Sequence, residues 1–398
     1  MKKLSGKYTS AKIMTELVDR ESIAQIELLI NNPAFINPVC IMPDVHKGIG
    51  SVIGFTMKLP DKVVPNVIGV DIGCGILTVC IGENLRKSLS EIDKIIKQVV
   101  PLGFKQHQKK IVTKIDFSDA NKSLKTFYGK FNKVFDTRYK PEAYNEKWLS
   151  TKVSEIGVDL KTFYNSIGTL GGGNHFIEIG QSINNNNYYV TIHSGSRHFG
   201  LKIANYWQKI ANDYVRNNAI KGVSKELSYL QDLEMMGYLT DMVFAQYYAK
   251  LNRETILKLI LEKLNFIPGQ KIESVHNYID PDDMFIRKGA IRSYINELMV
   301  IPLNMRDGIL ICEGKSNPEW NYSAPHGAGR LLSRRQAFKK VNLQDFIDSM
   351  KNVYSTSINK KTIDESPFAY KPRELIEKSL LPTCNIIDKI LPVINIKA

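Results

Sequence analysis

Five of the seven histidines in the chain lie in glycine-rich segments or where an apolar run ends. They occur in MPDVHKGIG, GGGNHF, HSGSRHFG, SVHNYID and PHGAGR, as His46, His175, His193, His276 and His326. A lone histidine is more often a structural residue than a metal ligand or a catalytic group. The same turn-and-strand setting in five places therefore points to a function for the set as a whole.

Asp71 and Cys74 add a carboxylate and a thiol in the segment VIGVDIGCGI. Gly73 and Gly75 allow a tight turn at the end of a buried apolar run, so both side chains can face one point. Together with imidazoles they form a ligand set that suits zinc, manganese, iron or cobalt, and a thiolate can bridge two such ions. Taken alone, the pair is better explained as a turn-forming aspartate and a small buried cysteine.

Two glycine-rich stretches beside these histidines, LGGGNHF and PHGAGR, offer places for a phosphate. Where glycine removes the Cβ atom, backbone N–H groups can approach an anion, and the second stretch is expected to open a helix whose N-terminus favours negative charge. Such stretches are commoner as plain turns, so the signal is weak by itself. Neither stretch fits the dinucleotide-binding or P-loop pattern, which excludes those two interpretations.

His326 differs from the other histidines in its basic surroundings. Arg330 follows four residues later, and Arg334 and Arg335 lie beyond it. A neutral imidazole in such a setting can attack phosphorus to form a phosphoramidate, which splits one difficult transfer into two easier steps. Metal ions beside it would neutralise phosphate charge and orient the attack. The setting therefore suits a histidine nucleophile.

The elements that must position these residues mix strand and helix without a regular repeat. Apolar residues at helical spacing predict an N-terminal helical segment over residues 9–31, and β-branched runs broken by glycine predict strands over 38–81. Residues 85–165 are rich in lysine and are predicted to form a helical insertion. The next expected elements are strands at 167–179 and 188–193 and an exposed polar hairpin loop at 182–187.

The second half of the chain continues this mixture. Its expected elements are a long helical stretch at 201–265, strands at 271–275, 290–301 and 308–312, and a final strand in ILPVINIKA. PHGAGRLLSRRQAF is expected to form a glycine turn that opens a helix. This order predicts an α+β fold with antiparallel or mixed sheets flanked by helices. Because no linker-like stretch is visible, we expect one large domain over residues 1–398.

The bulk composition narrows the class of partner. A formal charge of +14 attracts phosphate-rich polymers, so nucleic acid is the first candidate, with a lysine-rich solvated surface as an equal alternative. The basic pairs Lys109-Lys110, Arg334-Arg335 and Lys339-Lys340 are too short to decide between them. Five cysteines without a CxxC pair, no signal-peptide pattern and no membrane-spanning run predict a reduced, cytoplasmic protein. We expect a monomer, because no heptad or exposed apolar repeat is present.

Five motifs, taken in order over most of the chain, resemble those of the RtcB family of RNA-splicing ligases: MPDVHKGIG, VDIGCGI, GGGNHF, HSGSR and HGAGR. The resemblance extends from about Pro38 to Lys397, and residues 85–165 are its least anchored part. IPLNMRDG and NYSAPHGAGR suggest a bacterial branch of the family. The fold that this resemblance implies is an RtcB-like single large α+β domain.

The resemblance also implies roles for individual residues. The implied metal ligands are Asp71 and His175 for one manganese ion, His193 and His276 for a second, and Cys74 as a bridge between both. His326 matches the family's guanylylated histidine, and Asp44 would orient its ring or assist its activation. The implied guanylate contacts are Asn174, His175, Phe176, Ile177, Glu178, His276, Asn277, Pro302, Leu303, Asn304, Met305, His326, Gly327, Ala328, Gly329 and Lys397.

The implied activity is that of a GTP-dependent ligase of RNA 3′-phosphate and 5′-hydroxyl ends, acting in RNA repair or tRNA splicing. The nucleophilic histidine attacks the α-phosphate of GTP, the guanylate moves to the 3′-phosphate, and the 5′-hydroxyl then displaces GMP. A 2′,3′-cyclic phosphate is first opened to the 3′-phosphate. The implied partners are RNA, GTP and two manganese ions, and the need for an activator protein is left open.

Two other interpretations are a metal-dependent cyclic phosphodiesterase without sealing activity and a catalytically silent RNA-end-binding protein. The intact HGAGR motif argues against the first, and the complete ligand set argues against the second. Two departures from the family pattern concern substrate range more than catalysis. His198 and Phe199 follow HSGSR, and Asn304 stands where many members have a Gly-Ser pair.

Overall fold

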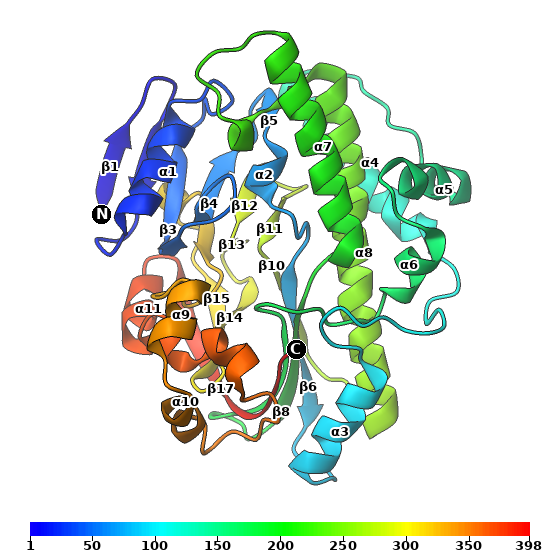
Figure 1. Ribbon diagram of the computed structural model, residues 1–398, viewed down its shortest axis with the longest axis vertical. Coiled ribbons are helices and arrows are strands. Elements are labelled where there is room, and N and C mark those ends of the chain that lie inside the picture. The colour runs from blue at the N-terminus through cyan, green and yellow to red at the C-terminus, as the bar shows by residue number, and fades with distance from the viewer.

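Two large β-sheets form the centre of the protein, and helices lie around them (Figure 1). The computed structural model describes residues 1–398. The six-stranded sheet has the order β1 (Lys2–Ser5), β2 (Ser10–Ile13), β3 (Val39–His46), β4 (Ile53–Lys58), β12 (Phe285–Lys288) and β11 (Asn277–Ile279). It is a mixed sheet, because β2 and β3 are parallel and the other pairs are antiparallel.

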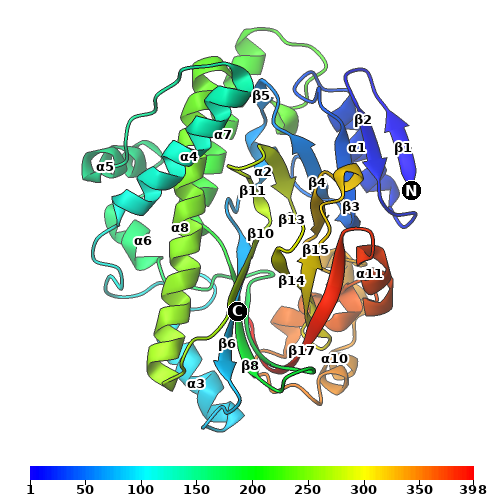
Figure 2. The same cartoon turned by 180° about the vertical axis from the view of Figure 1, so that it is seen from behind.

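The seven-stranded sheet is antiparallel throughout. Its order is β10 (Lys271–Val275), β6 (Gly75–Gly82), β8 (Tyr188–Ser194), β7 (Phe176–Ser182), β17 (Cys384–Ile396), β15 (Gly308–Gly314) and β14 (Leu298–Asn304). Two short ladders pair β5 (Lys62–Val63) with β9 (Leu230–Gln231) and β13 (Ala290–Arg292) with β16 (Ser323–Pro325). The C-terminal strand β17 is inserted between β7 and β15 (Figure 2).

One group of helices lies on one side of the sheets. The group consists of α3 (Leu89–Val99), α4 (Phe117–Phe135), α5 (Glu146–Glu155), α6 (Leu160–Asn165), α7 (Arg197–Asn217) and α8 (Asp232–Leu264), and it includes the three longest helices, α4, α7 and α8. Ile92 and Ile96 of α3 and Ile256 and Ile260 of α8 form one apolar cluster with the seven-stranded sheet. None of the helices is both long and apolar enough to span a membrane.

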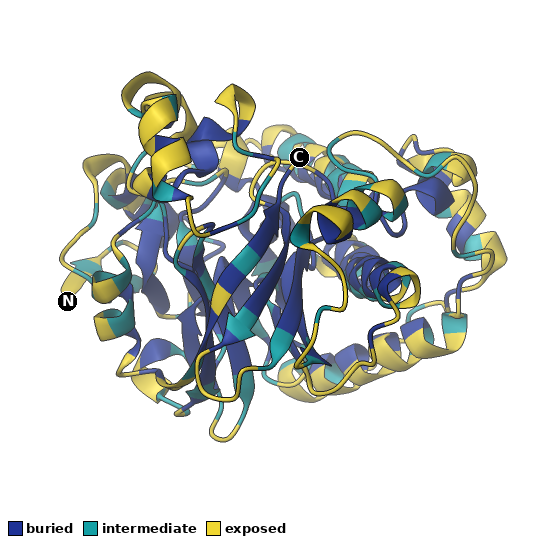
Figure 3. Ribbon diagram, turned by 90° about the horizontal axis from the view of Figure 1, so that it is seen from below, coloured by how far each residue is buried: buried dark blue, intermediate teal, exposed yellow.

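The remaining helices complete the fold around the sheets. They are α1 (Arg20–Ile30), α2 (Pro65–Ile68), α9 (Arg334–Lys340), α10 (Leu343–Ser349), α11 (Arg373–Leu380) and the 3-10 turns Lys225–Leu227, Pro318–Trp320, Lys360–Glu365 and Pro367–Ala369. Figure 3 shows buried strands at the centre and exposed helix and loop surfaces around them. The predicted α+β class, with mixed and antiparallel sheets flanked by helices, is confirmed.

The predicted insertion at 85–165 is helical, and it shares its core with the rest of the chain. Tyr144 donates a hydrogen bond to the Thr240 carbonyl at 2.6 Å, and Tyr128 donates one to the Met236 carbonyl at 2.7 Å. Both acceptors belong to α8. The insertion is therefore packed on α8 through buried aromatic residues, and the division of the chain into domains stays a prediction.

Two predicted helix starts are wrong. Residues 9–31 are not one helical segment, because residues 10–13 form β2, and α1 begins only at Arg20, after Asp19 caps it by accepting a hydrogen bond from Ser22 N. The glycine turn at 326–329 does not open a helix directly. The following helix α9 starts at Arg334, where Ser333 and Gln336 form a capping box. The turn therefore receives no support from a helix dipole.

Two predicted strand boundaries also differ. Residues 167–175 are not strand, because β7 begins at Phe176 after the turns of the glycine-rich stretch. The predicted strand at 290–301 is interrupted, since β13 ends at Arg292 and β14 begins at Leu298. The hairpin of β7 and β8 around the polar loop at 182–187 is confirmed.

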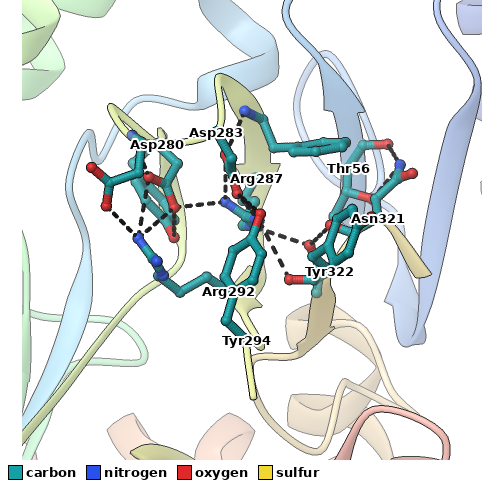
Figure 4. Close-up of polar contacts among 12 residues, drawn as sticks. Thr56, Asp280, Asp283, Arg287, Arg292, Tyr294, Asn321 and Tyr322 are labelled. Carbon is teal, nitrogen blue, oxygen red and sulfur yellow. Dashed lines mark hydrogen bonds and ion pairs between the residues drawn. The ribbon is translucent and has the colours of Figure 1, made fainter. Parts of the chain in front are cut away.

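A buried ion network joins the six-stranded sheet to the β13–β16 ladder (Figure 4). Arg287 of β12 is fully buried and binds Asp280 at 2.9 Å and Asp283 at 2.7 Å. Its Nε also donates to the Ser323 hydroxyl on β16 at 2.9 Å. Arg292 extends the network by pairing with Asp280 at 3.2 Å. The network thus fixes β16, the strand that directly precedes His326.

Candidate functional site

Four of the predicted metal ligands lie at the ends of adjacent strands of the seven-stranded sheet. Cys74 directly precedes β6, His175 directly precedes β7, and His276 directly follows β10. His193 is the penultimate residue of β8 and pairs with Ile76 on one side and Phe176 on the other. Because these strands are neighbours and antiparallel, the four side chains converge where the strands end, on one side of the sheet.

The converging side chains form a continuous chain of short contacts. Cys74 Sγ lies 3.4 Å from His175 Nε2 and 3.3 Å from His193 Nε2. His193 Nε2 is 3.3 Å from His276 Nε2, and Asp71 Oδ2 is 2.9 Å from His175 Nε2. The structure thus brings all five predicted ligands together, and the ligand atoms of the cysteine and its two neighbouring histidines lie within 4.8 Å of one another.

The outer hydrogen bonds of the rings fix which nitrogen faces this cluster. His175 Nδ1 lies 2.9 Å from the Leu170 carbonyl, and His193 Nδ1 lies 3.2 Å from the Asn174 carbonyl. An Nδ1–H that donates to a carbonyl leaves a lone pair on Nε2. Several lone pairs and a thiol then face one another without enough protons between them. A divalent cation satisfies such a donor set, so these residues fit a metal centre.

The protonation preferences of two histidines and of the aspartate in this cluster agree with metal binding. Burial, together with the neighbouring rings, lowers the pKa of His193 and of His276 well below the usual range, which keeps both imidazoles neutral. Burial opposes ionisation of Asp71, but its contact with His175 and the nearby charge of Arg197 hold the pKa of its carboxyl at about 2. Neutral imidazole and ionised carboxylate are the forms that bind metals.

His326 lies beside this cluster and is oriented by Asp44. His326 Nδ1 is 2.6 Å from Asp44 Oδ2, and the His326 backbone N–H donates to the same oxygen at 3.2 Å. Asp44 is fully buried at the end of β3, whereas the His326 side chain is 15% exposed. The His326 and His276 ring centroids are 4.7 Å apart. With Nδ1 bound to the carboxylate, Nε2 is the nitrogen with a free lone pair.

The loop after His326 crosses β3 so closely that it requires glycine. A Cβ atom on Gly329, whose φ is +71°, would lie 2.4 Å from the Asp44 carbonyl oxygen. Gly289 approaches from the other side, and a Cβ atom there would lie 3.3 Å from His326 Cε1 and 2.2 Å from a methyl of Ile53. These glycines therefore serve close packing of backbone around Asp44 and His326.

Lys371 joins the two segments that carry Asp44 and His326. Its buried ammonium donates to the Pro43 carbonyl at 2.8 Å and to the Val45 carbonyl at 3.1 Å, one on each side of Asp44. Its backbone N–H donates to the Gly329 carbonyl at 3.1 Å. Lys371 was not predicted, because nothing in its local sequence PFAYKPRE distinguishes it from a surface lysine.

A cavity of about 890 Å³ opens from His326 and His193 toward the surface. Most of the predicted guanylate contacts line it, namely Asn174, Phe176, Glu178, Pro302, Leu303, Asn304, Met305, His326, Gly327, Ala328, Gly329 and Lys397. Asn304, where the sequence departs from the family pattern, also shapes the turn to β15, because its side chain donates a hydrogen bond to Asp307 at 2.7 Å. The other departure, His198, is exposed on α7, and Phe199 beside it is buried among aromatic residues.

Four predicted contacts lie outside the cavity lining. Ile177 belongs to the apolar cluster on the opposite face of β7, because successive strand residues point to opposite faces. His175 and His276 belong instead to the cluster of predicted metal ligands, which is called the metal-type cluster below. Asn277 bonds the Gly289 N–H at 3.0 Å and the Asp71 carbonyl at 3.3 Å.

Glu178 places a buried carboxyl in the cavity wall. Its Oε2 accepts a hydrogen bond from Asn395 at 2.8 Å, and its Oε1 has no partner in the protein. Burial raises the pKa of Glu178 to about 8, against the hydrogen bond from Asn395 and the charge of Lys397. A buried carboxyl oxygen without a partner, on a residue that lines a cavity, can accept a hydrogen bond from a ligand.

Lys397 reaches the cavity from the chain's last strand and is held by Glu365. Lys397 Nζ is 2.6 Å from Glu365 Oε2, and Arg330 binds the other oxygen of Glu365 at 3.0 Å. The Tyr370 hydroxyl also donates to Glu365, at 2.6 Å. Glu365 was not predicted, because the segment TIDESPF gives no local sign of the long-range partners of this glutamate.

Comparison with known proteins gives one consistent family. The family model described as tRNA-splicing ligase RtcB matches residues 25–398. The chain is 28% identical to the RNA-splicing ligase RtcB of Escherichia coli K12, covering 99% of this chain and 98% of that protein. It is 23% identical to the tRNA-splicing ligase RtcB of Nanoarchaeum equitans, covering 98% and 94%, and 24% identical to that of Archaeoglobus fulgidus, covering 92% and 88%.

Proposed function

The chain belongs to the RtcB family of tRNA-splicing ligases, and we propose that it seals RNA ends through a guanylate carried on His326. One observation carries this proposal. Asp44 binds His326 Nδ1 at 2.6 Å and so directs the free Nε2 lone pair away from the carboxylate, beside a metal-type cluster and a large cavity. A nucleophile, an orienting carboxylate and a place for a nucleotide thus lie together.

In the first step, His326 Nε2 attacks the α-phosphorus of GTP, and the bond to the β-phosphate oxygen breaks. Pyrophosphate leaves, and a phosphoramidate remains on the ring. Asp44 holds the Nδ1 proton and stabilises the positive charge that develops on the imidazole. Lys371 keeps Asp44 in place by binding the carbonyls on both of its sides. The chain thus provides an oriented and electrostatically supported nucleophile.

The metal centre would be held by the five converging side chains. We propose that Asp71 and His175 bind one manganese ion, that His193 and His276 bind a second, and that Cys74 bridges them. When bound, such ions neutralise phosphate charge and orient the reacting groups. The identity and number of the ions are part of this proposal.

We propose that Glu178 selects the guanine base. Guanine presents a ring N–H and an exocyclic amino group on one edge, and both are donors that a carboxylate can accept. The partnerless Glu178 Oε1 lies in the cavity wall together with Phe176 and Lys397. Adenine has no donor at the corresponding ring nitrogen, so a site built for paired donors would reject it.

The later steps join the RNA. An oxygen of the RNA 3′-phosphate attacks the guanylate phosphorus, the N–P bond to His326 breaks, and the guanylate is now linked to the RNA end. The 5′-hydroxyl then attacks the 3′-phosphate, loses its proton and expels GMP. A 2′,3′-cyclic phosphate is opened by water beforehand. We propose RNA ends of these types as substrates, in RNA repair or tRNA splicing.

The test is transfer of label from α-labelled GTP to the protein in the presence of manganese, followed by denaturing electrophoresis. We expect label on the wild type and none on His326→Ala. His198→Ala is the matched control, because this histidine is exposed on α7 outside the site and should label normally. Label retained by His326→Ala would refute the nucleophile, and an unlabelled wild type, even with an activator protein present, would favour an esterase or an RNA-end-binding protein.

A further inference from the structure

The segment Pro101–Ile115, which joins α3 to α4, has an unusual surface. Over these residues the chain has four lysines, all exposed, and no acidic residue: Lys105, Lys109, Lys110 and Lys114. None of the four pairs with a carboxylate, and the ammonium of Lys110 lies 4.1 Å from the centroid of the Tyr164 ring. The segment is therefore a strip of unneutralised positive charge.

Phe104 stands in this strip with its side chain fully exposed, at 106% of the reference value. A single exposed apolar residue is common and needs no explanation by itself. Here, however, the backbone beside the ring is fixed. Gly103 N–H donates to the Gly171 carbonyl at 2.9 Å, and Arg197 donates to the Gly103 carbonyl at 3.2 Å. The ring is thus held outward on an anchored loop.

The anchor places the segment at the rim of the candidate site. Gly171 belongs to the glycine-rich stretch before His175, and Arg197 belongs to the HSGSR motif. A Cβ atom on Gly103 would lie 3.7 Å from the side chain of Ala398, the neighbour of Lys397 in the cavity wall. Figure 1 shows the chain after α3 passing beside the C-terminus.

A second basic group lies across the same glycine-rich stretch. The Arg334 guanidinium is 3.1 Å from where a Cβ atom on Gly173 would lie, and Arg334 also lines the cavity. Arg335, Lys339 and Lys340 of α9 are exposed beyond it. The glycine-rich stretch therefore separates two positively charged surfaces, only one of which carries a fully exposed aromatic ring.

We propose that the segment Pro101–Ile115 binds the single-stranded RNA that leads into the site, with Phe104 stacking on a base and the four lysines facing phosphates. This rests on the proposed function, because RNA is the substrate that the site would take. An aromatic ring stacks on any base, and lysines neutralise phosphates without reading sequence, so the surface suits RNA ends of varied sequence. A ring and charges on one anchored loop match the alternation of bases and phosphates along a strand.

The test measures binding of a fluorescent single-stranded RNA that ends in a 3′-phosphate. Phe104→Ala should bind it about 5- to 150-fold more weakly than the wild type, because one stacking contact is lost. The combined variant Lys105→Gln, Lys109→Gln and Lys110→Gln should lower the slope of log affinity against log salt by about 2, since each phosphate contact on a single strand contributes about 0.7. Binding of a blunt RNA duplex should be unaffected by Phe104→Ala, because its bases are stacked inside.

Matched controls lie on α7, in the segment between α7 and α8, and at the start of α8. Leu233→Ala removes an apolar side chain of 76% exposure, and Lys209→Gln, Lys221→Gln and Lys225→Gln remove three exposed charges. These controls should bind RNA as the wild type does. Wild-type affinity in both the Phe104 and lysine variants, or equal losses in the controls, would overturn the proposal, as would an equal effect of Phe104→Ala on the duplex.

Labelling by GTP separates this proposal from the proposed function. Transfer of guanylate to His326 requires no RNA, so Phe104→Ala should label as fully as the wild type. If the wild type takes no label, the ligase proposal fails, while a loss of RNA binding in Phe104→Ala would still support the RNA surface. If labelling is normal and the variants bind RNA normally, only the RNA surface is refuted.

Discussion

Cys74 is the residue on which the metal proposal depends most directly. Its sulfur lies within 3.4 Å of two imidazole nitrogens, yet burial and the Asp71 charge raise the pKa of its thiol well above the usual range. A thiolate in this position needs a cation for its stability, and a bound cation would in turn deprotonate the thiol. The metal and the thiolate thus stabilise each other.

We expect Cys74→Ala to lose at least about tenfold in manganese affinity, because the proposed bridge between the ions is removed. Cys80→Ala is the matched control, since Cys80 lies on the same strand β6 but outside the cluster. The measurement is metal content per chain after gel filtration in the presence of graded manganese. Equal manganese retention in Cys74→Ala and the wild type would contradict the bridging role.

Glu178 gives the site a testable pH dependence. Burial raises its pKa from the usual value of 4.5 to about 8, so the carboxyl of the free protein is protonated at neutral pH. Guanine donors require the carboxylate form. GTP affinity should therefore rise about tenfold per pH unit as the pH increases toward 8 and level off above it, because ionisation no longer opposes binding there.

The pH series is measured by calorimetry on His326→Ala, in which GTP cannot react. Glu178→Gln in the same background should bind GTP more weakly at pH 8 and show a flatter pH profile, because the amide does not titrate. The pH dependence of GTP affinity that remains in Glu178→Gln reports ionisation of the nucleotide itself. An identical slope with glutamate and glutamine would show that Glu178 does not bind the base.

At the scale of elements, Lys371 determines how β3 and the loop after His326 meet. Replacing it with methionine leaves two buried carbonyls unpaired and frees the segment around Asp44 to shift. Since a displacement of about 1 Å can reduce a rate about 100-fold, we expect Lys371→Met to slow guanylylation by about that factor. Noncovalent GTP affinity should change little, because Lys371 does not line the cavity.

Lys378→Met is the control for this prediction, because Lys378 is exposed on α11 a short distance along the chain. Single-turnover labelling gives the rate, and calorimetry on the His326→Ala background gives the affinity. A parallel loss of rate and GTP affinity in Lys371→Met would indicate general unfolding of the pocket. An unchanged rate would show that the contacts of Lys371 do not position Asp44.

Elements also show where sequence reasoning succeeded and where it could not. The strands that carry Cys74, His193 and His276 were predicted because short apolar runs end at glycine or at a chemically distinctive residue. The start of α1 was misplaced because residues 11–13 pair with β3, about 28 residues further along the chain and outside any local sequence window. Lys371 was missed for the same reason, since its partner Pro43 is 328 residues away. The chemical role that a residue type can play is predictable from the sequence, whereas a role that depends on contacts between distant parts of the chain is not.

At the scale of the whole molecule, the site is assembled from both large sheets. Asp44 comes from the six-stranded sheet, and His326 follows the small β13–β16 ladder. Four of the proposed metal ligands lie at strand ends of the seven-stranded sheet. The sequence predicted both kinds of sheet and all of these residues, but not the way in which the sheets are joined. The placement of the two sheets and the β13–β16 ladder relative to one another therefore decides whether His326 lies beside Asp44 and the metal-type cluster.

The ion network around Arg287 is one connection that holds this placement. Arg287 is fully buried and binds two carboxylates and the Ser323 hydroxyl, so Arg287→Met leaves buried negative charge without its main partner. We expect this change to destabilise the fold by about 3–5 kcal/mol, seen as a lower urea midpoint. Arg216→Met, which breaks an exposed pair on α7, should cost at most about 1 kcal/mol.

A second variant separates lost charge compensation from lost packing. Combining Arg287→Met with Asp283→Leu removes one of the two stranded carboxylates, so the urea midpoint should recover part of the loss. Guanylylation should recover with it, because β16 would again be fixed beside β12 ahead of His326. A double variant that is as unstable as Arg287→Met alone would mean that side-chain packing, and not buried charge, determines the stability of the contact between β12 and β16. Wild-type labelling in the unstable single variant would show that this contact does not position His326.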